Sequence, residues 1–194
     1  MIILASKSES RQAMLRAAKV DFKPVPASVD ERLIELSLED KRPQSVALAL
    51  SEAKAMAVSA GITGTYVLGS DSLIVADGQR FDKPESREQA AEHLRFFSGK
   101  VMELHSAAAL VRDGDLIWHH ADCAKLHVRK MSEDFIRYYL DMEWPAVRHC
   151  VGVFRIEAAG VQLFDRVEGD HFTILGMPLL PVLAALRTYG ELPG

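Results

Sequence analysis

Short apolar runs of strand type alternate with segments of helical period along this chain, and this alternation is the strongest constraint on its fold. The chain opens on the strand-type run Ile2–Leu4, and a helical segment follows to about Lys19. A second helix is expected from Pro43 to Ala60, because Pro43 suits a first helical turn and Gly61 suits a helix end. Strands that alternate with helices predict an α/β protein in which helices cover a sheet.

The stretch YVLGSDSLIVADGQRFDKP, from Tyr66 to Pro84, places a carboxylate between two strand-type runs, Tyr66–Leu68 and Leu73–Ala76. An ionised Asp71 among core-facing residues needs a hydrogen-bond donor, a cation or water. Asp77-Gly78 signals a turn, so the returning chain would bring Lys83 near the level of Asp71. An acid and an ammonium facing one cleft would suit a metal and an anionic substrate. Alternatively, Asp71 caps a turn and Lys83 is solvated.

The second half of the chain continues the alternation of strands and helices. Three helices are expected: after Ser86, after Ser132 and at Leu179–Arg187. Two long runs flank the turn Arg112–Asp115 and predict a hairpin: Val101–Val111 and Leu116–Val128. Further apolar runs of strand type are Val151–Phe154, Val161–Phe164 and Phe172–Leu175.

Length, charge and cysteine content exclude several classes of protein. The 194 residues suffice for one large domain or two lobes around a shared sheet. A net charge of -4 argues against sequence-independent nucleic-acid binding, which needs a basic face. No apolar run approaches the ~20 residues of a membrane span, and the first residues do not resemble a signal peptide. Cys123 and Cys150 form no CxxC pair, so we expect reduced thiols in a cytoplasmic protein.

Two further features fit an anionic ligand, although each also has a purely structural interpretation. Ser6 or Ser8 can cap the first helix, whose free N–H groups could bind an anion together with Arg11. Glu9 opposes this, because it places a negative charge at the same helix start. Lys54 falls on or beside the apolar face of the second helix, where it either extends outward along its stem or points into a cleft.

Short motifs in order along nearly the whole chain resemble the Maf family of septum-formation inhibitors, also called Maf-like nucleoside triphosphate pyrophosphatases. They are LASKSESR at the N-terminus, VDE at 29–31, EAKA at 52–55, GSD at 69–71, DKP at 82–84, FSG at 97–99, CVGVFRIEAAGVQLF and VEGDHFTILGMPLLPVL. The resemblance implies one domain, residues 1–194, with an elongated, bent mixed β-sheet flanked by helices. It also implies two lobes around a central cleft, as in the inosine-triphosphatase type.

The activity implied by the resemblance is hydrolysis of a nucleoside triphosphate to the monophosphate and pyrophosphate, with a divalent metal, Mg²⁺ or Mn²⁺. The implied assembly is a homodimer, and the implied role is to keep odd nucleotides out of nucleic acid. A different class, a nucleotide-binding regulator of cell division that needs no catalysis, is the main alternative. Inosine triphosphatase activity would rest on fold analogy alone.

The resemblance also assigns residues to a site. Asp71 matches the acid of the G-x-D motif, usually the catalytic proton acceptor, and Glu31 matches the acid of V-x-E near the metal. Four other positions match lysines or the phosphate-binding turn of the family: Lys54, Lys83, Ser8 and Arg11. A triphosphate needs cations, and a divalent metal needs hard oxygen ligands such as Glu31 and Asp71.

Departures from the family pattern affect phosphate binding and base choice. The common S-P-x-R-R start reads Ser8-Glu9-Ser10-Arg11-Gln12, so one arginine is missing and phosphate affinity is lower unless another cation compensates. Asp82 adds a carboxylate beside Lys83, and Ser72 follows the motif acid. Glu157 stands where pyrimidine-specific members tend to have Gln, which favours guanine-type bases such as 7-methyl-GTP over dTTP or UTP. Alternatively, Glu157 is an ordinary surface glutamate.

Overall fold

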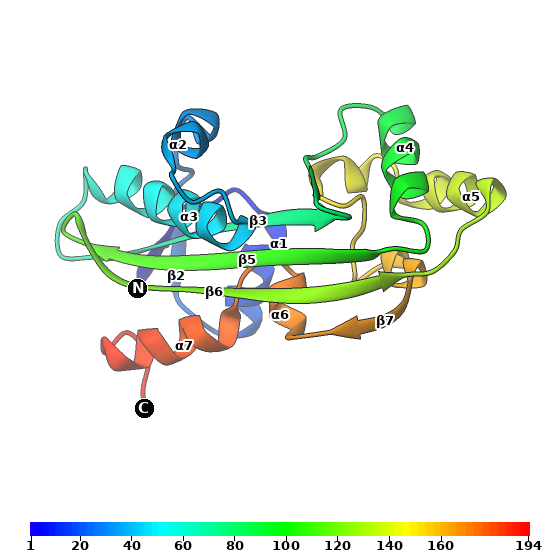
Figure 1. Cartoon of the computed structure of the whole chain (residues 1–194). Helices are drawn as coiled ribbons and strands as arrows, with labels where there is room; N and C mark the ends of the chain where they lie inside the picture. Colours follow the sequence, from blue (N-terminus) through cyan, green and yellow to red (C-terminus); the bar gives the residue numbers. More distant parts are fainter. The chain divides into compact units, whose positions relative to one another are not determined.

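A computed structural model describes residues 1–194 and contains seven strands in one mixed sheet with flanking helices (Figure 1). The strand order is β2-β1-β3-β5-β6-β7, and β4 pairs with β3. Strand β1 is parallel to β2 and β3, whereas the β3–β4 and β6–β7 pairs are antiparallel. The expected α/β class with a mixed sheet is therefore confirmed.

The strands are β1 (Ile2–Leu4), β2 (Phe22–Pro24), β3 (Tyr66–Ala76), β4 (Gln79–Phe81), β5 (Val101–Arg112), β6 (Asp115–Val128) and β7 (Phe164–Glu168). The α-helices are α1 (Glu9–Ala17), α2 (Glu31–Ser37), α3 (Pro43–Ser59), α4 (Arg87–Phe97), α5 (Glu133–Glu143), α6 (His171–Ile174) and α7 (Leu179–Thr188). Two 3-10 helices, η1 (Ala146–His149) and η2 (Ala159–Leu163), complete the elements. No helix has the length and apolar character needed to cross a membrane.

The chain divides into two compact units, each with its own apolar core. The first unit comprises Met1–Ser72, His105–Asp122 and Leu175–Gly194, and the second comprises Leu73–Leu104 and Cys123–Ile174. A core cluster of the first unit contains Ile3, Ala55, Val58, Val67 and Val111. The cluster of the second unit contains the fully buried Phe97 and Tyr139.

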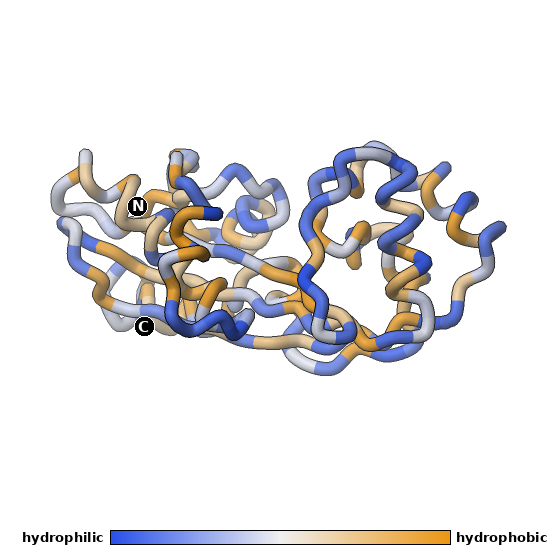
Figure 2. Tube along the Cα trace, turned by 45° about the horizontal axis from the view of Figure 1, so that its top comes forward, coloured by the Kyte–Doolittle hydropathy of each residue, from blue (hydrophilic) through white to orange (hydrophobic).

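Local signals place the helix starts where the sequence predicts them. The Ser8 side chain caps α1, Ser86 caps α4 and Ser132 caps α5, each by accepting a backbone N–H three residues ahead. Pro43 opens α3, which ends at Ser59. Hydrophobic and hydrophilic residues alternate along α4 and α5 (Figure 2), so each can bury one face and leave the other in water.

The central stretch forms one strand rather than two. Strand β3 runs unbroken from Tyr66 to Ala76, because the polar residues between the two apolar runs find partners on both faces of the strand. The predicted turn that follows is confirmed. Asp77 and Gly78 have φ of 53° and 74°, the left-handed conformations that a two-residue hairpin turn requires, and Ala76 pairs with Gln79.

Three expected strand segments of the last third are helical or irregular. Phe172–Leu175 is not a strand, because the Asp170 carboxylate accepts the N–H groups of Phe172 and Thr173 and starts α6. Val161–Phe164 lies mostly in η2, and β7 begins only at Phe164. Val151–Phe154 is irregular, with positive φ at Gly152 and Val153.

Candidate active site

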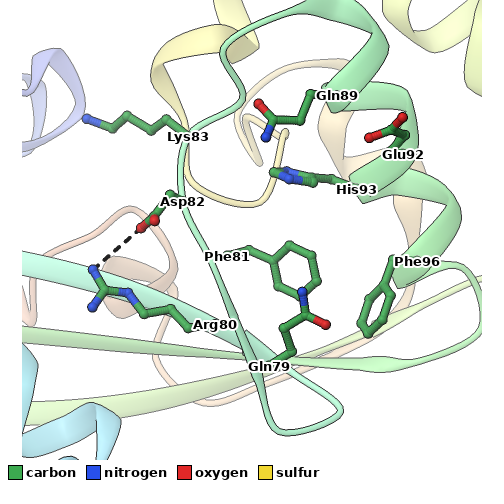
Figure 3. A pocket seen from close by; sticks show the side chains of 9 residues that line it. All are labelled: Gln79, Arg80, Phe81, Asp82, Lys83, Gln89, Glu92, His93 and Phe96. Atoms are coloured by element: carbon green, nitrogen blue, oxygen red, sulfur yellow. Dashed lines mark ion pairs between the residues drawn. The ribbon is translucent and has the colours of Figure 1, made fainter.

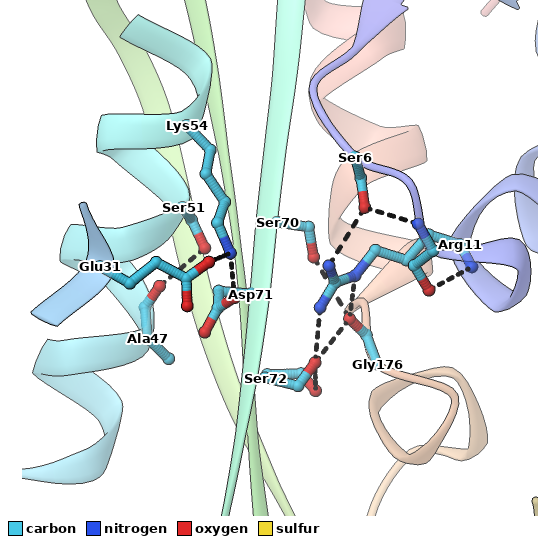
Figure 4. A network of polar contacts seen from close by, with 12 residues as sticks. Ser6, Arg11, Glu31, Ala47, Ser51, Lys54, Ser70, Asp71, Ser72 and Gly176 are labelled. Carbon is cyan, nitrogen blue, oxygen red and sulfur yellow. Dashed lines mark hydrogen bonds and ion pairs between the residues drawn. The ribbon is translucent and has the colours of Figure 1, made fainter. Parts of the chain in front are cut away.

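Strand β3 presents different chemistry on its two faces. Side chains alternate along a strand, so Gly69 and Asp71 face one way while Ser70 and Ser72 face the other. Asp71 lies on the side of α3, and the two serines lie on the side of Arg11 and Gly176 (Figure 4). The Ser-Asp-Ser sequence therefore separates a charged cluster from a hydroxyl network by the thickness of one strand.

Small residues bring α3 against β3. Ala47, Ser51 and Ala55 recur at every fourth position of α3, all are fully buried, and the Ser51 hydroxyl donates back to the Ala47 carbonyl at 2.7 Å. Opposite them, a Cβ on Gly69 would lie 2.1 Å from the Ser51 carbonyl oxygen and 2.9 Å from the Ala55 amide nitrogen. Only glycine fits at this position, and the close approach brings Lys54 within reach of the strand.

Lys54 joins two carboxylates that are distant in sequence. Its Nζ lies 2.5 Å from Oδ1 of Asp71 and 2.8 Å from Oε1 of Glu31 (Figure 4). The Lys54 side chain is 14% exposed and that of Asp71 is 11% exposed, whereas that of Glu31 is 50% exposed. Lys54 therefore points into the site, and the alternative in which it extends into solvent is wrong.

Helix α2 places Glu31 at the site. Asp30 caps this helix through its side chain, which accepts the Leu33 N–H at 2.9 Å, so Glu31 becomes the first helical residue. In the motif Val29-Asp30-Glu31, Asp30 therefore caps the helix backbone and Glu31 forms an ion pair with Lys54. Both roles follow from the spacing of one residue between a helix cap and the first turn.

The donor set of this cluster suits a hard divalent cation. Glu31 and Asp71 both approach one atom, Nζ of Lys54, so their oxygens can converge on a single positive centre. Carboxylate oxygens are the ligands that Mg²⁺ and Mn²⁺ prefer. The expected metal ligands, Glu31 and Asp71, are therefore brought together by the fold.

The opposite face of β3 carries a hydroxyl network centred on one carbonyl. The Gly176 oxygen accepts from Ser70 Oγ at 3.2 Å, Ser72 Oγ at 2.9 Å and Arg11 Nε at 2.9 Å. Gly176 has φ of +101°, and a Cβ there would lie 3.1 Å from the Ser72 hydroxyl. This network ties the residues on either side of Asp71 to the N-terminal turn and to the segment before α7.

Arg11 uses its guanidinium inside the protein. Besides Gly176, it donates to Ser6 Oγ at 3.3 Å and to Ser72 Oγ at 2.9 Å. Burial lowers the pKa of Arg11 from its ordinary value, and the negative charges of Asp71 and Glu31 oppose that shift. The hydroxyl of Ser8 caps α1, and contact of Ser8 and Arg11 with phosphate stays a prediction.

Lys83 belongs to the second unit, so its position relative to Asp71 also stays a prediction. It is exposed and lies at the edge of a cavity of about 370 Å³ that includes Phe81, His93 and Phe96 (Figure 3). The Lys83 side chain extends away from these rings, which leaves its ammonium free for an anion (Figure 3).

Glu157 also belongs to the second unit and is exposed, within the turn between Arg155 and η2. Its exposure is compatible with both of its sequence interpretations, a reader of the base and an ordinary surface glutamate. Cys123 and Cys150 do not form a disulfide.

Sequence reasoning missed the network around Gly176. Gly176 lies 106 positions after Ser70 and 104 positions after Ser72, and no local pattern joins it to them. The available signal was the alternation of two serines about Asp71, which implies a polar environment on both faces of a strand.

Comparisons with known proteins give a family. Residues 1–189 match the family described as Maf-like protein. A nucleoside triphosphate pyrophosphatase of Sphingopyxis alaskensis is 47% identical over 99% of this chain and 98% of that protein. A 7-methyl-GTP pyrophosphatase of Mesorhizobium japonicum is 46% identical over 100% of this chain and 98% of that protein. A HAM1 protein from Coxiella burnetii matches with a TM-score of 0.40 and 16% identity over 67% of this chain and 73% of that chain, too weakly to carry an argument.

Proposed function

Because this chain belongs to the Maf-like protein family, we propose that it hydrolyses a nucleoside triphosphate to the nucleoside monophosphate and pyrophosphate. The main support within the molecule is the pair of carboxylates, Glu31 and Asp71, held at 2.8 and 2.5 Å from the ammonium of Lys54. Two relatives that match along nearly their whole length carry the names nucleoside triphosphate pyrophosphatase and 7-methyl-GTP pyrophosphatase. No finding favours a regulator without catalysis.

In the proposed reaction, water attacks the α-phosphorus in line and pyrophosphate leaves. Asp71 acts on this water, either as its proton acceptor or as a metal ligand, and both roles need the ionised carboxylate. Glu31 and Asp71 would hold the divalent metal, Mg²⁺ or Mn²⁺, which supplies positive charge to the phosphates. Lys54 and Lys83 stabilise the charge that moves onto the leaving group, and Ser8 and Arg11 contribute to the phosphate turn.

Pyrophosphate release from a panel of nucleotides tests this function. The panel holds 7-methyl-GTP, GTP, UTP, dTTP, CTP and ITP, each with Mg²⁺, with Mn²⁺ and with a chelator. We expect release that depends on the metal. Tight binding of nucleotides without release from any of them would refute the enzyme and favour the regulator.

We further propose that Glu157 selects a purine base of the guanine type. Guanine presents N1–H and its 2-amino group as adjacent donors on one edge, and an ionised carboxylate only accepts hydrogen bonds. Uracil and thymine present one N–H between two carbonyls, which an amide matches better. Methylation of guanine at N7 adds positive charge to the ring, which a carboxylate also favours.

Replacing Glu157 with Gln is expected to shift preference towards UTP or dTTP. The ratio of kcat/KM for 7-methyl-GTP over UTP should fall by about 10-fold or more, because one mismatched polar group costs ~1–3 kcal/mol. Glu168→Gln, another exposed glutamate of the second unit, is the control. An unchanged ratio in Glu157→Gln would leave Glu157 as an ordinary surface residue.

The assembly is also a proposal. We propose that residues 1–194 act as one domain of two lobes and that two chains form a cytoplasmic homodimer. Sedimentation equilibrium of the intact chain measures the assembly directly, and a particle of one chain at micromolar concentration would contradict it.

A further inference from the structure

The segment that presents Glu157 has an unusual backbone. Gly152 and Val153 adopt φ of +82° and +60° in succession. A β-branched residue rarely has positive φ, and such a conformation persists only where its surroundings hold it. A Cβ on Gly152 would lie 2.3 Å from Cδ1 of Ile74 and 2.9 Å from Cε of Met102, so this part of the chain is pressed against the core of the second unit.

Helix α5 holds this segment at a first point through Tyr139. The Tyr139 hydroxyl donates to the Val153 carbonyl at 2.9 Å, and both residues are fully buried. Burial raises the pKa of Tyr139 far above its ordinary value, so the hydroxyl keeps the proton it donates. The strained residue is therefore hydrogen-bonded directly to helix α5.

Glu143, one turn further along α5, holds the segment at two more points. Its side chain is 5% exposed, and Oε2 accepts Arg155 Nε at 2.8 Å while Oε1 accepts the Ala159 N–H at 3.3 Å. The hydrogen bond to Glu143 raises the pKa of Arg155. One carboxylate thus joins both ends of the five-residue turn Arg155–Ala159, and the exposed Glu157 stands at the middle of that turn.

The turn is also closed by its own backbone. The Ala158 N–H donates to the Arg155 carbonyl at 3.1 Å. A Cβ on Gly160 would lie 2.4 Å from the carbonyl oxygen of Arg155 and 2.6 Å from its backbone nitrogen. The backbone at Gly160 therefore packs directly against the backbone of Arg155. The position of Glu157 is therefore fixed by contacts at both ends of the turn.

We propose that Glu143 is a positioning residue for base selection, acting through Glu157. The inference rests on the proposed function, because it assigns to Glu143 the task of ordering the side chain that contacts the base. A turn that is ordered before the ligand arrives loses less conformational entropy on binding, and two acceptor atoms aimed at one base edge need that order to discriminate. Glu143 does not touch the substrate itself.

Glu143→Gln is the direct test. The amide has the shape of the carboxylate but places an NH₂ donor against either Arg155 Nε or the Ala159 N–H, so one of the two contacts is lost. We expect the kcat/KM ratio of 7-methyl-GTP over UTP to fall by about 5-fold or more, mainly through a higher KM for 7-methyl-GTP. The rate with UTP should change little.

Glu133→Gln is a matched control on the same helix. Glu133 also accepts an arginine Nε, that of Arg95, at 2.8 Å, but its side chain is 59% exposed. Its loss should leave base preference and stability unchanged, because exposed ion pairs contribute little. The comparison separates the effect of the turn from that of a lost charge on α5.

A double variant distinguishes positioning from simple stabilisation. In a Glu157→Gln background, Glu143→Gln should cause no further change in base preference, because the group it positions is already gone. Amide hydrogen exchange at Arg155–Ala159 should accelerate in Glu143→Gln. Faster exchange with an unchanged base ratio would overturn the inference and leave Glu143 as a structural residue.

If Glu143→Gln fails to fold, Arg155→Lys replaces it. Lysine keeps the charge but lacks the Nε–H that Glu143 accepts, and the Ala159 contact remains. The same fall in base preference is expected. Equal rates with every base in the wild-type chain would refute the roles of both Glu157 and Glu143, whereas the absence of any pyrophosphate release would refute the proposed function itself.

Discussion

Replacing Asp71 with Asn is expected to lower turnover by roughly 10²–10⁴-fold, the usual contribution of a positioned acid or base, while the fold stays intact. The carboxylate is the buried member of the pair around Lys54, and its Oδ1 lies 2.5 Å from the ammonium. Asparagine has the same shape but neither accepts a proton nor binds a divalent metal strongly. The loss follows whichever of the two roles Asp71 has.

The fold should survive because Lys54 keeps a partner. Glu31 remains 2.8 Å from its Nζ, so the substitution does not leave an unpaired buried cation. Single-turnover pyrophosphate release and thermal unfolding measure the two effects separately. Asp77→Asn is the control, because Asp77 is exposed in the hairpin turn and has a positive φ that asparagine tolerates. Wild-type turnover in Asp71→Asn would remove Asp71 from the reaction.

Local signals in the sequence were enough to predict most helices and the central hairpin. The caps Ser8, Ser86 and Ser132 act within three residues, and the Asp77-Gly78 turn acts within four, so each is encoded where it occurs. The apolar run after Asp170 was misassigned as a strand, because the signal that decides its structure lies outside the run itself. A short apolar run does not distinguish strand from helix, and the cap that decides between them lies just before it.

The site was predictable only in part. From the residues alone, Lys54 could either extend outward along its stem or point into a cleft. The family motifs indicated Asp71, Glu31 and Lys54 together, and the fold brings the three together. The network around the Gly176 carbonyl could not be predicted, because its donors come from residues 11, 70 and 72 and no periodicity links them. Arg11, which the family motif assigns to the phosphate-binding turn, donates hydrogen bonds to this network.

Contacts on both faces of β3 therefore position one residue, Asp71. On one face, the close approach of α3 brings Lys54 to Asp71, and on the other, the two neighbouring serines are held by the Gly176 carbonyl. A carboxylate held from both sides loses little freedom when a substrate binds. The closeness of α3 to the strand at Gly69 is the feature on which this arrangement depends most.

Gly69→Ala is accordingly expected to damage stability and activity together. The added Cβ would lie 2.1 Å from a carbonyl oxygen and 2.9 Å from an amide nitrogen of α3, and neither backbone atom can move without displacing the helix. Overpacking of this kind costs ~1–3 kcal/mol, which corresponds to a fall in Tm of several degrees for a chain of this size. A displacement of Lys54 from Asp71 by about 1 Å would lower turnover by roughly 10²-fold.

Gly61→Ala separates this effect from the general consequences of replacing a glycine. Gly61 follows the same helix, is exposed, and has no atom within 4 Å of an added Cβ. Its substitution should leave turnover unchanged and Tm equal or slightly higher, because alanine restricts the unfolded chain. Thermal unfolding and pyrophosphate release, measured for the two variants side by side, test both expected effects. If Gly69→Ala matched Gly61→Ala in both, the contact between α3 and β3 would not be what holds Lys54 at Asp71.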